Sequence, residues 1–281
     1  MGLENTLRVA VVQMDVHLGQ VTHNLQRILV LLEKATECGA QLVVFPECAL
    51  SGYCFDSVED ARRYALPAYE SPSSPVGEFV QACIRHNVIG VLGFLELASQ
   101  GAIYNSAAIA ARSLHAPWIY RKTHLPTLGV DRFIARGERL EVCAVNGVRL
   151  GPLICYDARF PEAARVLTLR GAQVIVLPTN WPEGAESAPE YMLRTRAREN
   201  GVFILAANRI GIERGRRFIG RSQIVSPDGM VLAQAGDGEE ILYADITPTR
   251  ADTKRIVIEP GAWEQDTVGD RRPELYGDLT R

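Results

Sequence analysis

A strand, a helix and a second strand follow one another in the segment GPLICYDARFPEAARVLTLRGAQVIVLP, Gly151–Pro178. The apolar run Val148–Cys155 predicts one buried strand, and VIVLP at Val174–Pro178 predicts another. Between them, Pro161–Arg170 has proline in its first turn and Gly171 directly after its end, which is typical of a helix. Alternation of this kind predicts a layered α/β fold.

The same alternation extends over most of the chain. Before this segment, apolar runs and amphipathic stretches predict strands at Leu7–Met14, Gln41–Phe45, Val88–Leu95, Ile103–Ala110 and Trp118–Arg121, and helices at Thr22–Cys38 and Val76–His86. After it, the same signals predict a helix at Ser187–Asn200 and strands at Val202–Asn208, Gln223–Val225, Met230–Ala233 and Ile241–Ile246. Ser187 and Glu190 have the spacing of a capping box, which predicts that this helix begins at Ser187.

Length and composition describe an ordinary globular chain. It has 281 residues, of which 47% are hydrophobic and 22% charged, so it can bury a sizeable core. No long linker, low-complexity segment or short repeat divides it. We therefore expect a single domain over residues 1–281. From about residue 247 to 281 the sequence is polar, with proline, glycine and paired arginines, which predicts a C-terminal arm.

The charge pattern argues against nucleic acids and membranes as partners. Net charge is −3 with both signs interspersed, so there is no basic surface of the kind that binds nucleic acid. No apolar run reaches the roughly 18 residues of a membrane span. The N-terminus lacks the basic region of a signal peptide. It fits the loose N-myristoylation pattern at Gly2, which short sequences often meet by chance.

The cysteines and histidines show no disulfide or metal pattern. None of the six cysteines forms C-x-x-C, and the five histidines lack H-x-H and H-E-x-x-H spacings. A chain of this length needs no disulfides to stabilise it, so the cysteines indicate reduced thiols and a cytoplasmic location. We expect no metal site.

Three polar side chains stand where apolar runs end. Glu47 follows VVFP, Lys122 follows WIYR, and Cys155 ends RLGPLI. Taken singly, a glutamate or lysine at a strand end is usually solvated, and a cysteine in an apolar run is usually core. Together they would meet at one edge of an α/β sheet, where such folds place their sites. There a glutamate can take a thiol proton, a lysine can stabilise an oxyanion, and a cysteine can attack a carbonyl.

Three motifs around these residues resemble those of the nitrilase superfamily, the carbon–nitrogen hydrolases with a glutamate–lysine–cysteine set. They are LVVFPECALSGY (Leu42–Tyr53), YRKTHLP (Tyr120–Pro126) and GPLICYDARFPE (Gly151–Glu162). Further similar pieces are VLPTNWP, RARENGVFILAANRIG, GRSQIVSPDG and DRRPELY. The similarity runs from Leu7 to about Tyr276, and three motifs in order are a specific signature.

The resemblance implies a four-layer α-β-β-α sandwich and assigns the three roles. Glu47 is the implied general base, Lys122 the oxyanion stabiliser and Cys155 the nucleophile, with the backbone N–H of Tyr156 as a second oxyanion donor. No metal or organic cofactor is implied. Members of this family pair through their helical faces, and their C-terminal arms cross to a neighbouring subunit, so we expect a homodimer or higher homo-oligomer.

Other site residues also follow from the resemblance, with one departure. Many members have a second glutamate after the lysine. Here the segment HLPTLGVDRFIARGERL offers Asp131, one methylene shorter, as the best match, with Glu138 as the less favoured alternative. The implied substrate-binding residues are Tyr53, Tyr156, Asn180 and Trp181. The residues expected to hold loops rather than contact substrate are His124, Asp157 and Arg159. For the basic cluster Arg214, Arg216 and Arg217, we expect a solvated loop.

The cysteine motif favours an amidase over a nitrilase. True nitrilases commonly have Trp-Glu after the cysteine, whereas this chain has Tyr156 and Asp157, as in Nit-type amidases. The predicted reaction cleaves a small-molecule amide to a carboxylic acid and ammonia through a thioester on Cys155. The near alternative is hydrolysis of N-carbamoyl amines or amino acids. Two other classes are a peptide hydrolase that pairs Cys155 with His124 and a non-catalytic interaction protein.

Overall fold

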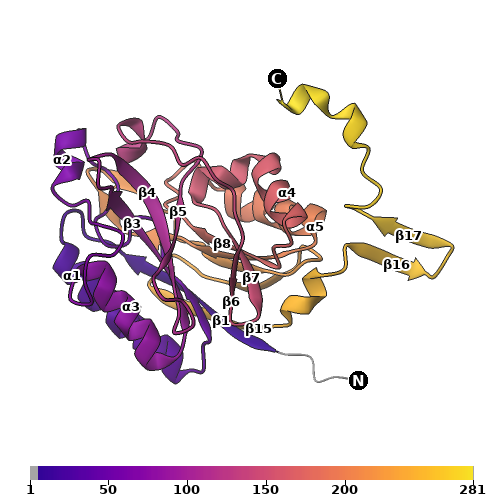
Figure 1. The fold of residues 1–281 in the computed structure, drawn as a ribbon, viewed down its shortest axis with the longest axis horizontal. Coiled ribbons are helices and arrows are strands. Elements are labelled where there is room, and N and C mark those ends of the chain that lie inside the picture. The colour runs from indigo at the N-terminus through magenta and orange to yellow at the C-terminus, as the bar shows by residue number, and fades with distance from the viewer. Residues whose placement is uncertain (1–5, 281) are drawn as a thin grey trace.

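The computed structural model describes residues 6–280, and it contains two β-sheets stacked face to face (Figure 1). Gly2, the position that fits the myristoylation pattern, lies outside the described residues. The first sheet has seven strands in the order β10-β1-β2-β3-β4-β5, with β15 also paired to β1. Its strands are β1 (Leu7–Asp15), β2 (Leu42–Val44), β3 (Ile89–Leu97), β4 (Ile103–Ala110), β5 (Trp118–Arg121), β10 (Arg209–Ile210) and β15 (Glu240–Ile246).

The second sheet has six strands in the order β14-β13-β9-β8-β7-β6. They are β6 (Cys143–Val145), β7 (Val148–Pro152), β8 (Val174–Pro178), β9 (Phe203–Ala207), β13 (Gln223–Val225) and β14 (Val231–Gln234). In each sheet three central strands are parallel, β1-β2-β3 in the first and β7-β8-β9 in the second. Their carboxyl ends therefore lie at one edge of each sheet. A small hairpin, β11 (Ile212–Glu213) with β12 (Arg216–Arg217), lies outside both sheets.

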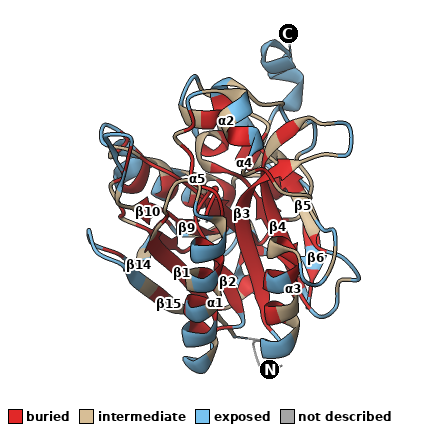
Figure 2. Cartoon of the chain, turned by 90° about the vertical axis from the view of Figure 1, so that its left-hand side faces the viewer, coloured by how far each residue is buried: buried red, intermediate tan, exposed pale blue. Residues whose placement is uncertain are grey.

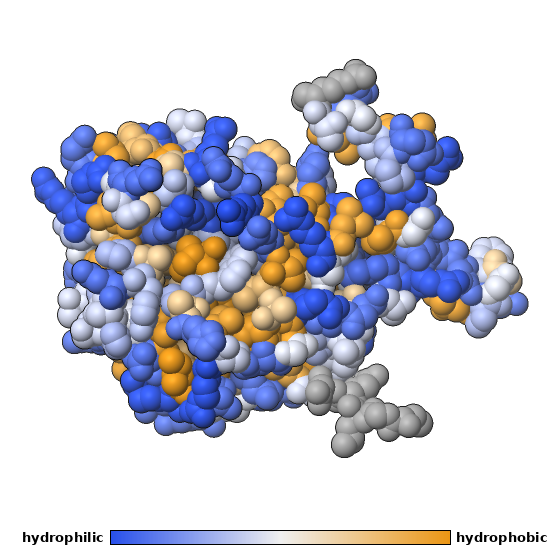
Figure 3. Space-filling view, viewed as in Figure 1, coloured by the Kyte–Doolittle hydropathy of each residue, from blue (hydrophilic) through white to orange (hydrophobic). Residues whose placement is uncertain are grey.

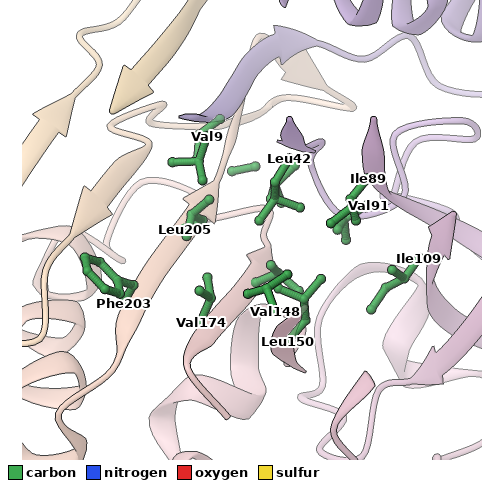
Figure 4. Close-up of a cluster of buried hydrophobic side chains, with 14 of the residues drawn as sticks. Val9, Leu42, Ile89, Val91, Ile109, Val148, Leu150, Val174, Phe203 and Leu205 are labelled. Carbon is green, nitrogen blue, oxygen red and sulfur yellow. The ribbon is translucent and has the colours of Figure 1, made fainter. Parts of the chain in front are cut away.

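The main core lies between the two sheets, as the strand period of two requires. In β1, Val9 and Val11 point into this space, whereas Ala10 and Val12 point to the opposite face. Figure 4 shows side chains from both sheets meeting there, including Val9, Leu42, Val91, Val174 and Leu205. This inter-sheet cluster joins the two halves of the chain.

Helices cover the outer face of each sheet. The first sheet is covered by α1 (Val21–Glu37) and α3 (Pro75–His86), and the second by α4 (Pro161–Leu169) and α5 (Leu193–Asn200). In Figure 2 the central strands β2, β3 and β4 are buried, and the outward surfaces of α1 and α3 are exposed. The predicted four-layer α-β-β-α sandwich is confirmed. A short helix, α2 (Val58–Arg62), is additional and begins at Ser57, whose hydroxyl accepts from the Asp60 N–H at 3.1 Å.

Two predicted element boundaries are wrong. The strand expected at Val148–Cys155 ends at Pro152, because Cys155 has a φ of 44° and begins the 3₁₀ turn Cys155–Arg159. Ser187 is not a capping residue. Its φ and ψ of −58° and −23° are already helical, whereas an N-cap serine needs extended backbone to direct its hydroxyl at the free amides. The chain there forms a π-helical turn, Ala188–Met192, which leads into α5.

The C-terminal segment extends away from the sandwich (Figure 1). After β15 it forms a hairpin of β16 (Arg255–Glu259) and β17 (Trp263–Asp266), followed by short 3₁₀ turns. Its charged residues are accompanied by exposed apolar ones, with Ile258 at 77% and Trp263 at 67% exposure. Figure 3 shows such apolar side chains on the arm and near the place where it leaves the sandwich.

Candidate active site

Glu47 lies in a tight turn directly after β2. Cys48, the next residue, has a φ of 48°, a left-handed conformation that a residue with a side chain adopts only at a cost. Gly93 on β3 allows this turn to pack closely, since a Cβ there would lie 2.3 Å from the Pro46 carbonyl oxygen. The carboxylate of Glu47 is fully buried. The turn therefore forces a charged group into the interior at a strand end.

Lys122 follows β5 and lies between two carboxylates. Its Nζ is 2.7 Å from Glu47 Oε1 and 2.6 Å from Asp131 Oδ2. Asp131 comes from the 3₁₀ turn Gly129–Arg132, and all three side chains are buried. The structure thus brings together the two strand-end residues and the aspartate that the sequence offered as a replacement for the second glutamate.

Cys155 lies in the 3₁₀ turn that follows β7, near enough to Glu47 and Lys122 for their charges to act on its thiol. The residue is partly exposed, and it packs against both the inter-sheet core and the core under α4 and α5. Burial, and then the charge of Glu47, raise the pKa of the Cys155 thiol to about 12. Lys122, the Thr179 hydroxyl and the Asn180 backbone N–H act in the opposite direction. The thiol therefore carries its proton at neutral pH and needs a base in order to react.

The charged groups shift one another's pKa values. Burial raises the pKa of Glu47, and Asp131 adds to this, while Lys122 and Asn105 oppose it. Burial alone would lower the pKa of Lys122, but the charges of Asp131 and Glu47 hold it well above its usual value. Lys122 therefore stays protonated, and Glu47 binds a proton more readily than an exposed carboxylate does.

Two of the predicted substrate-binding tyrosines have different surroundings. Tyr53 is buried, and its hydroxyl donates to Asp131 Oδ2 at 2.8 Å and lies 3.1 Å from the Leu128 carbonyl oxygen. This phenol therefore holds Asp131 in place. Tyr156 directly follows the cysteine, is partly exposed, and packs edge-on against the Phe160 ring with 5.2 Å between centroids.

Asn180 and Trp181 lie directly after β8. Asn180 is 2% exposed, and among residues 6–280 neither polar atom of its carboxamide has a hydrogen-bond partner. A buried amide without partners costs about 1–3 kcal/mol, which a polar ligand can recover. Trp181 is 3% exposed and packs in the cluster under α4 and α5, and its backbone N–H donates to Asn208 Oδ1 at 2.7 Å.

Asp157 is the centre of a buried hydrogen-bond network next to Cys155. Its carboxylate accepts from the Tyr120 hydroxyl at 2.8 Å and from the His124 backbone N–H at 2.9 Å. The His124 ring lies 2.8 Å from the same carboxylate and stacks on Phe160 with 4.0 Å between centroids. These contacts hold the segment around Lys122 against the 3₁₀ turn that contains Cys155. Arg159 is exposed, on the outer side of this turn.

The basic cluster lies on the surface. Arg214 forms ion pairs with Asp56 and Asp60, and Arg216 and Arg217 are exposed in β12. Asp56 lies in the loop that follows the glutamate motif, and Asp60 lies in α2. Arg214 therefore fastens the β11–β12 hairpin to this segment.

A second buried ion pair, which was not predicted from the sequence, supports the site. Arg209 is fully buried, forms an ion pair with Glu213 and lies 3.2 Å from Asp15. The Glu213 carboxylate accepts from the backbone N–H groups of Tyr53 and Cys54 at 3.0 and 2.9 Å. It thereby holds the loop that presents Tyr53 to the ion cluster. The available signal was a charged residue at the end of a buried strand.

Replacing Arg209 with methionine is expected to destabilise the fold by about 3–5 kcal/mol, since Glu213 would keep a buried charge without its partner. Chemical denaturation of both proteins measures this difference. Arg216→Met, at an exposed position, is the matched control and should change stability by less than about 0.5 kcal/mol. Equal stability of the two variants would contradict the role of the pair.

Neither a metal cluster nor a membrane-spanning helix is found in residues 6–280. No group of three or more His, Cys, Asp and Glu side chains there is arranged to hold a metal ion. None of the helices is long and apolar enough to cross a membrane.

Residues 8–255 match the carbon-nitrogen hydrolase family, which covers most of the chain. The chain belongs to this family. The sequence-based prediction of a carbon–nitrogen hydrolase is thereby confirmed. The candidate active site of this carbon–nitrogen hydrolase is the buried Glu47–Lys122 pair with Cys155 of the nearby 3₁₀ turn.

Its relatives include several amidases. A hydrolase in the pqqF 5′ region of Pseudomonas protegens is 34% identical, over 98% of this chain and 93% of its own. An (R)-stereoselective amidase of Pseudomonas sp. is 32% identical, over 98% and 94%. Among solved structures, a variant of an amidase from Nesterenkonia sp. shows the acetamide moiety of fluoroacetamide covalently added at its active site cysteine. It is 26% identical, with a TM-score of 0.80 and 97% coverage of both chains.

Proposed function

We propose that this carbon–nitrogen hydrolase cleaves a primary amide of a small molecule to a carboxylic acid and ammonia through a thioester on Cys155. The observation that carries the proposal is the buried Glu47–Lys122 ion pair beside a thiol whose pKa is raised to about 12. Such a thiol cannot attack as a preformed thiolate. A base must take its proton as the carbon–sulfur bond forms, and Glu47 is that base.

Attack turns the amide carbonyl oxygen into an oxyanion, which needs donors. Lys122 has three N–H bonds, of which two point to Glu47 and Asp131, leaving the third for the oxyanion. The Tyr156 backbone N–H lies in the first turn of the 3₁₀ segment, where amides lack partners within the helix. Each donor of this kind contributes about 3–4 kcal/mol to lowering the barrier.

The tetrahedral intermediate then collapses. Glu47 returns the thiol proton to the amide nitrogen, the carbon–nitrogen bond breaks, and ammonia leaves with the acyl group still on Cys155. Water next attacks the thioester and gives a proton to Glu47. When the carbon–sulfur bond breaks, that proton returns to sulfur, and the carboxylic acid is released. The cycle thus restores both residues.

The amidases among the relatives support an amide as substrate, whereas relatives of Pyrococcus abyssi and Schizosaccharomyces pombe, 32% and 30% identical, are named nitrilase and probable nitrilase. Besides the stereoselective amidase, a 2-oxoglutaramate amidase of Bacillus subtilis is 30% identical over 85% of this chain. N-carbamoyl compounds present the same carbonyl and leaving nitrogen and are the second candidate class. Asn180 favours a substrate with a further polar group, because both of its buried carboxamide atoms lack partners within residues 6–280.

Ammonia release from the purified chain tests this function. The panel contains ω-amides of dicarboxylates, simple aliphatic amides, N-carbamoyl amines and amino acids, and nitriles. We expect an amide to give the highest kcat/KM, with a thioester on Cys155 detected by intact mass after rapid acid quenching. A nitrile or a carbamoyl compound as best substrate would replace the amidase proposal with that activity, and silence across the panel would overturn it.

We further propose that the chain forms one catalytic domain with an arm at about residues 247–281, that it is cytoplasmic, and that it works as a homo-oligomer. The exposed apolar residues of the arm, such as Ile258 and Trp263, support self-association, since large apolar groups on a projecting hairpin favour a partner surface. Light scattering of the full chain tests the homo-oligomer, and a monomer at micromolar concentration would contradict it.

A further inference from the structure

We infer that Asn105 is a positioning residue for the Glu47 carboxylate. Its hydrogen bond holds Oε1 in place, and Oε2 is left to accept and return protons. The inference rests on the proposed function, because it assigns one part of that reaction to one atom. Neither the three motifs nor the spacing of strand ends identifies Asn105, which lies within β4.

The geometry at Asn105 links both carboxylates. Its Nδ2 is 2.7 Å from Glu47 Oε1 and 3.0 Å from Asp131 Oδ1. A carboxamide nitrogen has two N–H bonds, so each carboxylate receives one of them. Lys122 Nζ donates to the same Oε1 at 2.7 Å. Glu47 Oε1 therefore accepts two hydrogen bonds.

The second oxygen of Glu47 is different. Within residues 6–280, Oε2 has no hydrogen-bond partner although it is buried. A buried carboxylate oxygen without a donor is costly, and here it is the atom with room to accept a proton. The Cys155 thiol is the nearby group that must lose one, and the Glu47 charge already acts on it. Oε1 thus keeps the carboxylate in position through its two hydrogen bonds, and Oε2 takes part in proton transfer.

The orientation of the carboxamide follows from its partners. Turning it over would place Oδ1 against two carboxylate oxygens, which repel it, so the nitrogen has to face them. In the present orientation Oδ1 is 3.6 Å from Cys48 Sγ, a thiol that can donate to it. The backbone of Asn105 is held as well, because its carbonyl oxygen accepts from the Lys122 N–H at 2.8 Å.

Asn105 also offsets an excess of negative charge. Glu47 and Asp131 together carry two charges, and Lys122 neutralises one of them. Two N–H donors stabilise the remaining charge, because hydrogen bonds to ionised groups are the stronger ones. Without them, the buried pair of carboxylates would bind a proton more readily. A Glu47 that is already protonated cannot accept the proton of the thiol.

The direction of a pH effect follows from the groups that face Glu47. These are the ammonium of Lys122, the carboxylate of Asp131, the carboxamide of Asn105 and, at longer range, Cys155, Cys48 and Tyr53. Burial raises the pKa of Glu47, and the Asn105 hydrogen bond is one of the effects that lower it. Removing that bond must therefore raise the pKa of Glu47. Because Glu47 has to be ionised to act as the base, the acid limb of the kcat/KM profile should move to higher pH.

The experiment replaces Asn105 with leucine, which has a similar size and no donor, and with aspartate, which keeps the shape. The matched control is Ser106→Ala. Ser106 is the next residue of β4, is equally buried, and donates to Glu96 Oε2 at 2.7 Å, outside the ion cluster. Each protein is measured for unfolding stability, for kcat and KM on the best amide, and for the pH profile of kcat/KM.

We expect both Asn105 variants to lose about 10- to 100-fold in kcat with little change in KM, and the acid limb of the Asn105→Leu profile to move to higher pH. Ser106→Ala should lose stability but keep its kcat and its profile. A kcat and acid limb like those of the wild type in Asn105→Leu would overturn the inference. So would an equal kcat loss in the Ser106 control.

A second readout separates this inference from the proposed function. Alkylation of Cys155 by iodoacetamide also requires a base but no amide hydrolysis. If the wild type hydrolyses nothing in the panel, the proposed function fails, and the pH dependence of alkylation still tests Asn105. A slower reaction with an acid limb at higher pH in Asn105→Asp or Asn105→Leu supports the positioning role. Identical alkylation profiles in wild type and variants would refute it.

Discussion

Replacing Cys155 with alanine will lower kcat for amide hydrolysis by roughly four to six orders of magnitude, as removal of a nucleophile does in other covalent hydrolases. The reason is that the thioester cannot form, so Glu47 and Lys122 are left with water as the attacking group. The loss should appear in kcat and in kcat/KM alike, because substrate can still bind. Intact mass should show no acyl adduct on the variant.

The matched control for this prediction is Cys38→Ala. Cys38 is an exposed cysteine at the end of α1, on the outer face of the first sheet. Its replacement should leave kcat unchanged. Near-ultraviolet circular dichroism of both variants checks that the fold is intact, since Cys155 has a φ of 44° that alanine must also adopt. Turnover by Cys155→Ala within a factor of ten of the wild type would eliminate the thioester mechanism.

Replacing Lys122 with methionine will lower both activity and stability. Methionine has a similar length but leaves Glu47 and Asp131 as two buried carboxylates without a cation, which costs about 3–5 kcal/mol of unfolding free energy. Activity should fall at least roughly 10³-fold. The oxyanion loses its charged donor, and a carboxyl that takes up a proton cannot serve as the base.

The stability loss of this variant should depend on pH in a definite direction. Without Lys122, burial and mutual repulsion raise the pKa of the carboxyl pair in the folded state above its unfolded value. The folded variant therefore binds a proton that the unfolded chain has lost, and stability falls as pH rises through the folded-state pKa. The deficit against the wild type should be smaller near pH 5 than near pH 8.

Denaturant unfolding at several pH values measures this trend. Lys34→Met, at an exposed position in the last turn of α1, is the control and should show neither the deficit nor its pH dependence. A deficit for Lys122→Met that is constant from about pH 5 to pH 8 would mean that the two carboxylates remain ionised without the lysine. The charge balance described for the site would then be wrong.

The layered fold could be predicted from the chain itself, and so could the three principal residues of the candidate site. Apolar runs and amphipathic stretches are local patterns, and a strand buried on both faces needs no distant information to be identified. Glu47, Lys122 and Cys155 each stand at the end of such a run, and three motifs in order resembled one family. Asp131 was also within reach, because it is nine residues from Lys122.

The hydrogen-bond partners within the site were decided only by the tertiary structure. Asn105 is 58 residues from Glu47 and 26 from Asp131, so no local pattern connects them. Arg209 and Glu213 clamp a loop more than 150 residues earlier in the chain. The Tyr53 hydroxyl donates to Asp131, 78 residues away, a contact that the sequence did not predict. Burial patterns and strand ends can be recognised from neighbouring residues in the sequence. The hydrogen-bond partner of a buried polar atom instead depends on which distant segments the packing brings within about 3 Å.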